Sequence, residues 1–326
     1  MIRAFVAAAG ASVTLPVSVG DDAAGLRAPA GEVLLLSTDA AVEGVHFRRE
    51  WMTWETVGYR AAAASLSDLA AMAASPLGAL VTLLLPPELE REVVTAIGSG
   101  VGECLREQRT PLIGGDVSRS PGPVAVEVVS VGSCRRPVPR TGARPGDELW
   151  VTGVLGGAAA AVWDLSRSME PDPRCRRRLE RPVPRLREAR WLAEEGRLTA
   201  MIDLSDGLSG DAGHMASASG VRLVLRADAV PLAPAVREFS NQDVALRLGV
   251  SGGEDYEILL AAAPGSVEGA RERFEERFRI PLTRVGTVER GKGVDWVDGR
   301  GKRLPMKPHG YDHFSAAEGE TGSPAC

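Results

Sequence analysis

Lysine is nearly absent from this sequence: Lys292, Lys302 and Lys307 are the only lysines in 326 residues. Because no lysine precedes position 292, the chain has no G-x-x-x-x-G-K-[ST] loop of the kind that cradles nucleotide phosphates. The lysine-centred signature of protein kinases is also missing. Most of the chain must therefore bind any phosphate through arginine, backbone N–H groups or metal ions.

Cysteine, long apolar runs and excess positive charge are also scarce. The four cysteines (Cys104, Cys134, Cys175 and Cys326) show no C-x-x-C spacing, which argues against a zinc site or a disulfide framework and predicts a reducing compartment. No apolar run reaches the roughly 18 residues of a membrane helix. The net charge of −5 lacks the basic excess typical of nucleic-acid binding. We therefore predict a cytoplasmic protein with neither a nucleic-acid nor a membrane partner.

The length and the breaker residues predict two domains. Residues 136–146 (RPVPRTGARPG) hold three prolines and two glycines, which is typical of a linker. We predict an N-terminal domain over 1–140 and a C-terminal domain over 141–326, with 315–326 as a disordered tail. Strand and helix patterns are mixed throughout, which predicts an α/β or α+β fold. Within the first domain, residues 32–38 (EVLLLST) predict a buried strand.

Aspartates recur where these apolar strands are predicted to end. They are Asp21 and Asp22 in VGDDAA, Asp39 in LLLSTDA, Asp116 in LIGGDVS, and Asp203 and Asp206 in MIDLSDGL. An aspartate after a strand is usually a turn former or a helix N-cap, and this reading stays open for each of them. Asp68 is different, because it is the only charge between Arg60 and Pro76 on a small, apolar helix. A carboxylate on such a face is costly unless it is paired or bound to metal.

Taken together, these carboxylates indicate bound cations. Several converging carboxylates repel one another unless positive charge lies among them. Magnesium prefers oxygen ligands, and Ser37 and Thr38 offer hydroxyl oxygens beside Asp39. The pattern predicts several magnesium ions bridging a polyphosphate. At glycines 114–115 and 252–253 the backbone could approach a phosphate closely. The Arg140 guanidinium could bind two phosphate oxygens at once, although Arg140 could equally be a solvated charge in the linker.

Eight strings in order resemble thiamine-monophosphate kinase. They are VGDDAA (19–24), STDAAVEGVHF (37–47), SLSDLAAMAA (65–74), IGGD (113–116), RTGARPGD (140–147), IDLSDGL (202–208), SGGEDYE (251–257) and GYDHF (310–314). The resemblance implies the two-domain fold of aminoimidazole ribonucleotide synthetase, with a dimer formed through the N-terminal sheet and an active-site cleft between domains. It implies ATP-dependent phosphorylation of thiamine monophosphate to thiamine diphosphate with several Mg²⁺ ions, ATP being the co-substrate.

The resemblance also implies roles for individual residues. The implied magnesium ligands are Asp22, Ser37, Thr38, Asp39, Asp68, Asp116, Asp203 and Asp206. The implied ATP contacts are Gly115, Asp116, Arg140 and Ser205, and the implied thiamine contacts are His46, Glu254 and Tyr311. No residue is expected to act as a catalytic base, because a phosphate acceptor is mostly dianionic near pH 7. Direct in-line transfer is therefore expected, driven by metal and positioning.

The sequence departs from the family pattern at two places, and three rival interpretations stay open: two related families and one protein of a different class. The family often has a tyrosine before the GGD motif that packs on adenine, whereas this chain has EQRT at 107–110. The family's acidic-aromatic opening before GDDAA is also missing. A selenophosphate synthetase would need a reactive cysteine near its N-terminus, but the first is Cys104. A hydrogenase-maturation dehydratase ends in a reactive cysteine, as this chain ends in Cys326, yet lacks STDAAVEGVHF and SGGEDYE. The third rival is a regulatory protein that binds nucleotide and metal without catalysis.

Overall fold

The computed structural model describes residues 1–10, 16 and 23–306. The chain forms two compact units. Among the described residues, the second unit contains Val138–Leu179 and residues 187–306, and the first contains the N-terminal part up to Pro137 together with Glu180–Leu186 from later in the chain. The expected tail at 315–326 lies outside the described residues. Within the described part of the chain, no helix combines the length and the hydropathy needed to cross a membrane.

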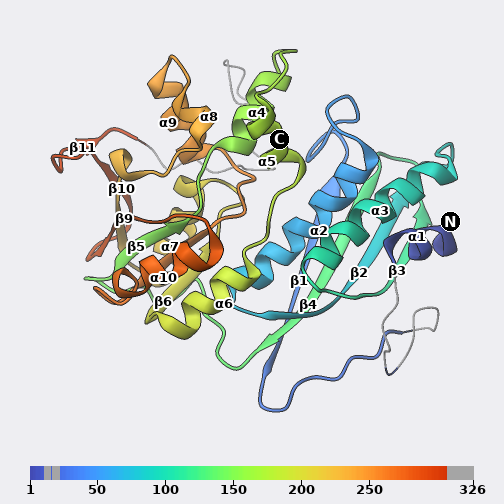
Figure 1. Cartoon of the computed structure of the whole chain (residues 1–326), viewed down its shortest axis with the longest axis horizontal. Helices are drawn as coiled ribbons and strands as arrows, with labels where there is room; N and C mark the ends of the chain where they lie inside the picture. The colour runs from blue at the N-terminus through green and yellow to red at the C-terminus, as the bar shows by residue number, and fades with distance from the viewer. Residues whose placement is uncertain (11–15, 17–22, 307–326) are drawn as a thin grey trace. The chain divides into compact units, whose positions relative to one another are not determined.

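The first unit is a four-stranded sheet with helices packed on it. Its elements are α1 (Ile2–Ala9), β1 (Val33–Val42), α2 (Trp54–Ala71), β2 (Ser75–Leu85), α3 (Arg91–Glu107), β3 (Leu112–Arg119) and β4 (Ala125–Cys134). The strand order is β1-β4-β2-β3; β2 and β3 are parallel, whereas β4 is antiparallel to both of its neighbours. Figure 1 shows α2 and α3 lying side by side against this sheet.

Helix α2 packs against one face of this sheet and is hydrogen bonded to it. Most of its residues are alanine, serine or other small types and are buried. Ser65 ties it to β4, because its hydroxyl donates to the carbonyl oxygen of Val128 at 3.0 Å. In return, the hydroxyl of Ser130 donates to the carbonyl oxygen of Ser65 at 2.9 Å. These buried bonds set the register of α2 along the sheet, and with it the position of every side chain that α2 presents.

Strand β1 is an edge strand, and the buried strand predicted from residues 32–38 is wrong. Leu34 and Leu36 are 47% and 69% exposed. Side chains alternate along a strand, so these leucines lie on the face of the sheet away from α2, while Ser37 lies on the face toward it. An apolar run predicts a strand but cannot tell a central strand from an edge strand whose apolar face is uncovered within one chain.

The second unit is a seven-stranded mixed sheet with more helices. Its elements are β5 (Glu148–Thr152), α4 (Gly157–Leu165), α5 (Pro173–Glu180), α6 (Leu186–Glu195), β6 (Leu198–Asp203), α7 (Leu208–Ser219), β7 (Arg222–Arg226), η1 (Ala227–Ala229), α8 (Pro234–Arg237), α9 (Gln242–Ser251), β8 (Ile258–Ala262), α10 (Glu268–Phe278), β9 (Leu282–Glu289), β10 (Gly293–Val297) and β11 (Arg303–Leu304). The strand order is β11-β10-β7-β9-β5-β8-β6, with β7 and β10 parallel and the other neighbours antiparallel.

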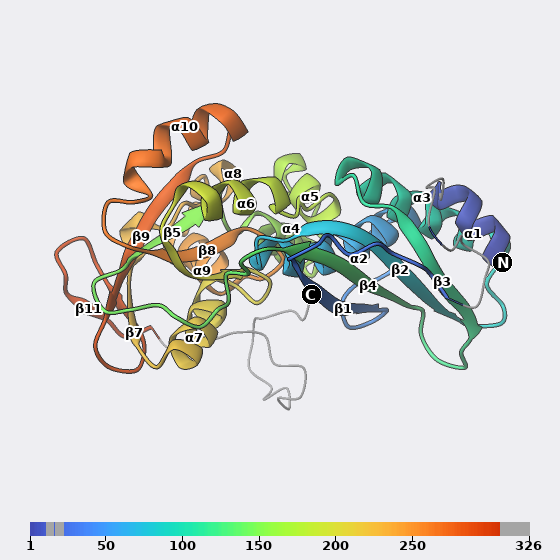
Figure 2. The ribbon, with the colours of Figure 1, turned by 90° about the horizontal axis from the view of Figure 1, so that it is seen from below.

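Both faces of this sheet are covered. Figure 2 shows α7 on one side and α6 and α10 on the other. Met215 of α7 belongs to the same buried cluster as Leu149 and Trp296 from the strands. On the other side, the rings of Trp191 in α6 and Phe274 in α10 are 5.8 Å apart. The central strands β5 and β8 are buried along their whole length, so the β6–α7 connection is attached to a rigid core.

Candidate active site

Three of the predicted metal ligands lie on the helix-covered side of the first sheet. Ser37 and Asp39 are alternate residues of β1, so both side chains point toward the face that α2 covers. The hydroxyl of Ser37 donates a hydrogen bond to Oδ2 of Asp68 in α2. All three residues are half-buried. Asp68 therefore accepts a hydroxyl hydrogen bond and is the only charged residue in the last 11 residues of α2 (61–71), which are otherwise alanine, serine and leucine.

Thr38 and Asp116 lie on the opposite face of the same sheet. Oγ1 of Thr38 donates to Glu127 of β4 at 2.9 Å, and Oγ of Ser118 donates to Asp116 at 2.6 Å. Strands β4 and β2 separate β1 from β3, so Thr38 and Asp116 are roughly 14 Å apart at ordinary strand spacing. Magnesium binds its ligands at about 2.1 Å, so a single ion cannot contact both.

Asp39 and Asp116 lie inside strands, whereas the sequence places them after the strand ends. Strand β3 continues through the GGD motif to Arg119. A Cβ on Gly115 would lie 2.0 Å from the carbonyl oxygen of Val81 in the neighbouring strand. Strand packing alone therefore requires glycine at this predicted ATP contact.

His46 lies in a tight turn that follows β1. Its backbone N–H donates to the carbonyl oxygen of Val42 at 2.8 Å, and the N–H of Val42 donates to Nδ1 of the His46 ring at 3.1 Å. Because Nδ1 accepts a hydrogen bond, the neutral ring carries its proton on Nε2. The turn thus fixes both the orientation and the tautomer of this predicted substrate contact.

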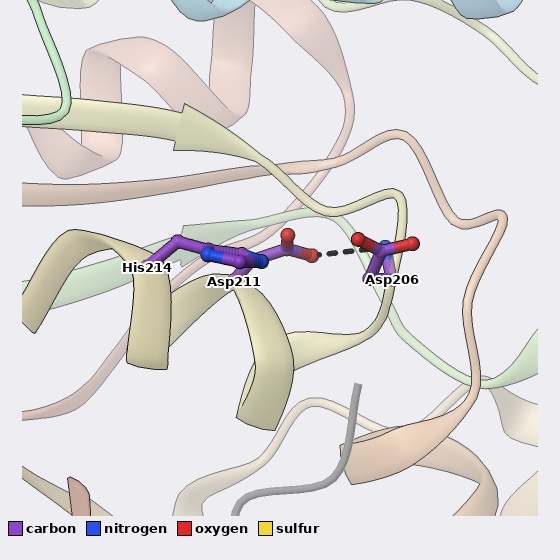
Figure 3. A group of neighbouring side chains, drawn as sticks. All are labelled: Asp206, Asp211 and His214. Carbon is purple, nitrogen blue, oxygen red and sulfur yellow. Dashed lines mark hydrogen bonds between the residues drawn. The ribbon is translucent and has the colours of Figure 1, made fainter. Parts of the chain in front are cut away.

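The second unit gathers carboxylates where β6 leads into α7. Asp203 is the last residue of β6 and is buried, and Asp206 lies in the following loop. Asp211 of α7 is 2% exposed, and its Oδ2 accepts the backbone N–H of Asp206 at 3.1 Å. Figure 3 shows Asp211 between Asp206 and His214. The possible ligand atoms of Asp206, Asp211 and His214 all lie within 4.8 Å of one another.

Negative charge accumulates at this loop. Burial, followed by the charges of Asp203 and Asp206, raises the pKa of Asp211 well above the ordinary aspartate value. The backbone N–H groups of Asp206 and Ser205 oppose this shift only in part. A bound cation relieves repulsion of this kind. The donors are mainly hard oxygen atoms, which suits a divalent cation such as magnesium.

The loop that carries Ser205 is hydrogen bonded to the loop that carries Glu254. The N–H of Glu254 donates to the carbonyl oxygen of Ser205, and the N–H of Tyr256 donates to that of Leu204, each at 2.9 Å. A Cβ on Gly253 would lie 2.4 Å from the Ser205 carbonyl oxygen. The close approach of the two loops is enough to require glycine at position 253.

The remaining predicted residues are Arg140, Asp22 and Tyr311. Arg140 is exposed in the second unit, and its backbone carbonyl accepts the hydroxyl of Ser219 at 3.2 Å. Its backbone is therefore held while its guanidinium reaches solvent. Asp22 and Tyr311 lie outside the described residues.

Sequence reasoning missed three carboxylates beside these groups: Glu127, Asp211 and Asp255. Glu127 accepts a hydrogen bond from Thr38 and Asp211 accepts one from Asp206, whereas Asp255 follows Glu254 in the chain and bonds to Gly156 at the start of α4. Glu127 stands alone in the valine-rich run VAVEVVSV, and such an isolated charge was the available signal. Asp211 and Asp255 follow other acidic residues in the sequence, so nothing local distinguished them.

Comparisons with known proteins agree with this architecture. Residues 20–134 match the family "AIR synthase related protein, N-terminal domain", and residues 144–298 match "AIR synthase related protein, C-terminal domain". Thiamine-monophosphate kinase of Rhodopirellula baltica is 34% identical over 307 residues, which cover 91% of this chain and 91% of that protein. The crystal structure of thiamine-monophosphate kinase from Stenotrophomonas maltophilia K279a has a TM-score of 0.81 at 32% identity, covering 90% of this chain and 94% of that one. AaThiL complexed with AMPPCP and TMP has a TM-score of 0.75 at 31% identity, covering 89% and 90% of the two chains.

A hydrogenase maturation protein shares the fold at a much lower sequence identity. Hydrogenase maturation protein HypE in complex with ATP has a TM-score of 0.77 at 17% identity, covering 95% of this chain and 93% of that one. At this identity the likeness shows the fold alone. The predicted two-domain α/β fold and the family resemblance are confirmed, and the chain belongs to the thiamine-monophosphate kinases, a family of phosphotransferases.

Proposed function

We propose that this chain transfers the γ-phosphoryl group of ATP to thiamine monophosphate, giving thiamine diphosphate by direct in-line transfer assisted by several magnesium ions. The carboxylate groups in both units carry the proposal. Ser37, Asp39 and Asp68 share one side of the first sheet, and Asp203 and Asp206 adjoin the buried Asp211 in the second unit. The 31% identity to AaThiL, a protein complexed with AMPPCP and TMP, supports the nucleotide and the acceptor.

The proposed magnesium ligands fit the ion chemically. They are Asp22, Ser37, Thr38, Asp39, Asp68, Asp116, Asp203 and Asp206, all of which offer oxygen. When bound, magnesium would neutralise phosphate charge and so reduce repulsion between ATP and an anionic acceptor. The separation of Thr38 from Asp116 across the sheet favours several ions over one.

The chain's own residues would bind and orient the two substrates. We assign Gly115, Asp116, Arg140 and Ser205 to ATP, and His46, Glu254 and Tyr311 to the thiamine substrate. The fixed tautomer of His46 supports a role as a hydrogen-bond donor through Nε2 rather than as a general base. An acceptor that is already dianionic needs no proton removed, so orientation is the main task of these side chains.

We further propose a homodimer that forms through the first sheet. Leu34 and Leu36 on β1 are largely exposed, and Leu84 on β2 is 37% exposed. All three lie on the face of the sheet away from α2. Leu34 and Leu36 are neighbours on this face, whereas Leu84 is level with Val42 toward its other end. Exposed apolar side chains spread over a sheet face are typical of protein–protein interfaces.

A coupled ADP-release assay tests the proposed function. The purified chain is given MgATP with thiamine monophosphate, thiamine or an aminoimidazole precursor, and product is identified by chromatography. We expect ADP release only with thiamine monophosphate, in a one-to-one ratio with thiamine diphosphate, and none after chelation of the metal. A chain that binds MgATP and thiamine monophosphate yet releases no ADP would instead be the regulatory alternative.

A further inference from the structure

The SGGEDYE segment holds two residues in an unfavourable backbone conformation. Glu254 has φ of 71° and Tyr256 has φ of 49°, both in the left-handed region. This region costs residues other than glycine on the order of 1 kcal/mol each, so it persists only where the surroundings hold the backbone. The strained pair lies on either side of Asp255, which points to Asp255 as a residue that holds it.

Asp255 is anchored to a helix from a different part of the chain. It is 7% exposed, and its Oδ2 accepts the backbone N–H of Gly156 at 2.8 Å. Gly156 is the N-cap residue of α4 and has no side chain with which to cap that helix. Asp255 thus accepts the N–H of the N-cap residue itself, and the amide of Ala158 in the first turn of α4, which an N-cap side chain would ordinarily bond, also stabilises its charged form.

Further contacts fix the chain just after Asp255. Glu257 is fully buried, its Oε2 accepts the hydroxyl of Thr152 at 2.8 Å, and its Oε1 pairs with Arg178 at 3.3 Å. By contrast, Oδ1 of Asp255 has no hydrogen-bond partner among the described residues. Asp255 is therefore fixed mainly by the hydrogen bond that its Oδ2 accepts at the start of α4.

We propose that Asp255 is a positioning residue for the thiamine substrate. By capping α4 from a separate segment, it keeps Glu254 in its left-handed backbone conformation and so sets the direction of the Glu254 side chain. This inference deepens the proposed function and rests on it for the assignment of Glu254 to the substrate. Asp255 itself need not touch substrate.

A double-mutant cycle tests whether Asp255 acts through Glu254. Values of kcat, KM for thiamine monophosphate and KM for ATP are measured for Asp255→Ala, Glu254→Ala and the double variant. We expect Asp255→Ala to raise KM for thiamine monophosphate at least about 10-fold and KM for ATP less than about 2-fold. In the Glu254→Ala background, Asp255→Ala should change KM for thiamine monophosphate by less than about 2-fold. If KM for thiamine monophosphate in the double variant instead rises by the product of the two single effects, the inference is overturned.

Two further variants separate positioning from a general loss of stability. Asp255→Asn keeps an oxygen that can accept the Gly156 N–H, so it should restore KM to within about 3-fold of the wild type, even if Asp255→Ala folds poorly. Asn241→Ala removes a comparable cap, because Oδ1 of Asn241 accepts the N–H groups of Asp243 and Val244 at the start of α9. An equal rise of KM in Asn241→Ala would show that any lost cap in this unit has the same effect, and the inference would fail.

Hydrogen exchange gives a readout that does not depend on activity. The amides of Glu254 and Tyr256 bond to the neighbouring loop and should exchange more slowly in the wild type than in Asp255→Ala. Asn241→Ala should leave their exchange rates unchanged. Slow exchange that persists in Asp255→Ala would overturn the inference whether or not the wild type phosphorylates thiamine monophosphate. A wild type without that activity but with the expected exchange pattern would overturn only the proposed function.

Discussion

Asp68 in α2 and Asp211 in α7 occupy similar positions in the two units. Each is an acidic residue on a helix, and each receives a hydrogen bond from the segment that carries other predicted ligands. Asp68 accepts the hydroxyl of Ser37, and Asp211 accepts the backbone N–H of Asp206. Burial of such carboxylates is unfavourable without compensating charge, so we expect them to contribute to activity more than to stability.

The first prediction concerns Asp68→Asn. Asparagine keeps the size of aspartate and can still accept the Ser37 hydroxyl, so the fold should survive while the negative charge is lost. We expect turnover to fall at least about 100-fold, with a higher magnesium requirement. Steady-state kinetics over a magnesium titration measure both, with Glu92→Gln on the exposed side of α3 as the control. Turnover close to that of the wild type would contradict a metal role for Asp68.

The second prediction concerns the pH dependence of stability at Asp255. Burial is the largest cause of a shift that raises the pKa of Asp255 from 3.8 to about 7, the charge of Glu257 adds to it, and the Gly156 amide and Arg178 oppose it. Between pH 4 and 7 the folded protein therefore binds more protons at this residue than the unfolded chain does. The contribution of Asp255 to stability is full below pH 4 and decreases as pH rises toward 7.

Asparagine at position 255 does not titrate, so Asp255→Asn should gain stability relative to the wild type as pH rises from 4 to 7. Denaturant unfolding of both proteins across this range measures the difference, and it should level off above pH 7. Asp243→Asn, at an exposed position of the same unit, controls for the removal of one negative charge. A difference that is constant with pH would contradict the raised pKa.

At the scale of elements, edge strand β1 carries two kinds of side chain on its two faces. The face toward α2 presents Ser37 and Asp39, while the other face presents Leu34, Leu36 and Thr38. A one-residue slip of this strand would exchange the two sets. Its ten-residue pairing with β4 therefore fixes the candidate metal ligands and the apolar face at the same time.

The third prediction tests that apolar face with Leu36→Lys. The side chain is 69% exposed, so the substitution should hardly change the stability of the folded chain. If the face is the dimer interface, a buried lysine opposes association, and we expect the dimer dissociation constant to rise at least about 10-fold. Sedimentation equilibrium measures it, with Met169→Lys in the second unit as a control that is 47% exposed in the wild type. A wild type that stays monomeric at all concentrations would contradict the proposed dimer.

At the scale of the whole molecule, the chain passes between the two units more than once. After α5 it contributes Glu180–Leu186 to the first unit and then returns to the second at α6. Arg181 anchors this crossing, because it pairs with Glu103 at 3.3 Å and lies over the ring of Tyr59 at 4.7 Å. The sequence predicted only the linker at 136–146, so this second connection between the units was not predicted.

The fourth prediction belongs to the whole reaction: no phosphorylated enzyme forms. The acceptor is itself an anionic phosphate oxygen, so an enzymic nucleophile would gain little by attacking ATP first. The chain is incubated with γ-labelled ATP and magnesium without acceptor, quenched with acid and analysed for protein-bound label. We expect none. Label that is chased into thiamine diphosphate on adding thiamine monophosphate would falsify direct transfer.

The sequence by itself determined the family, the α/β class and the residue types at the candidate site. Ordered motifs such as STDAAVEGVHF and SGGEDYE specify these locally, because turn chemistry and ligand type depend on neighbouring residues. Only the tertiary structure decided that Ser37 and Asp39 face α2 while Thr38 faces away, and that β1 is an edge strand. It alone brought Asp255 to the start of α4. Strand order and contacts between residues 99 positions apart depend on packing between distant segments, and no local pattern in the sequence records that packing.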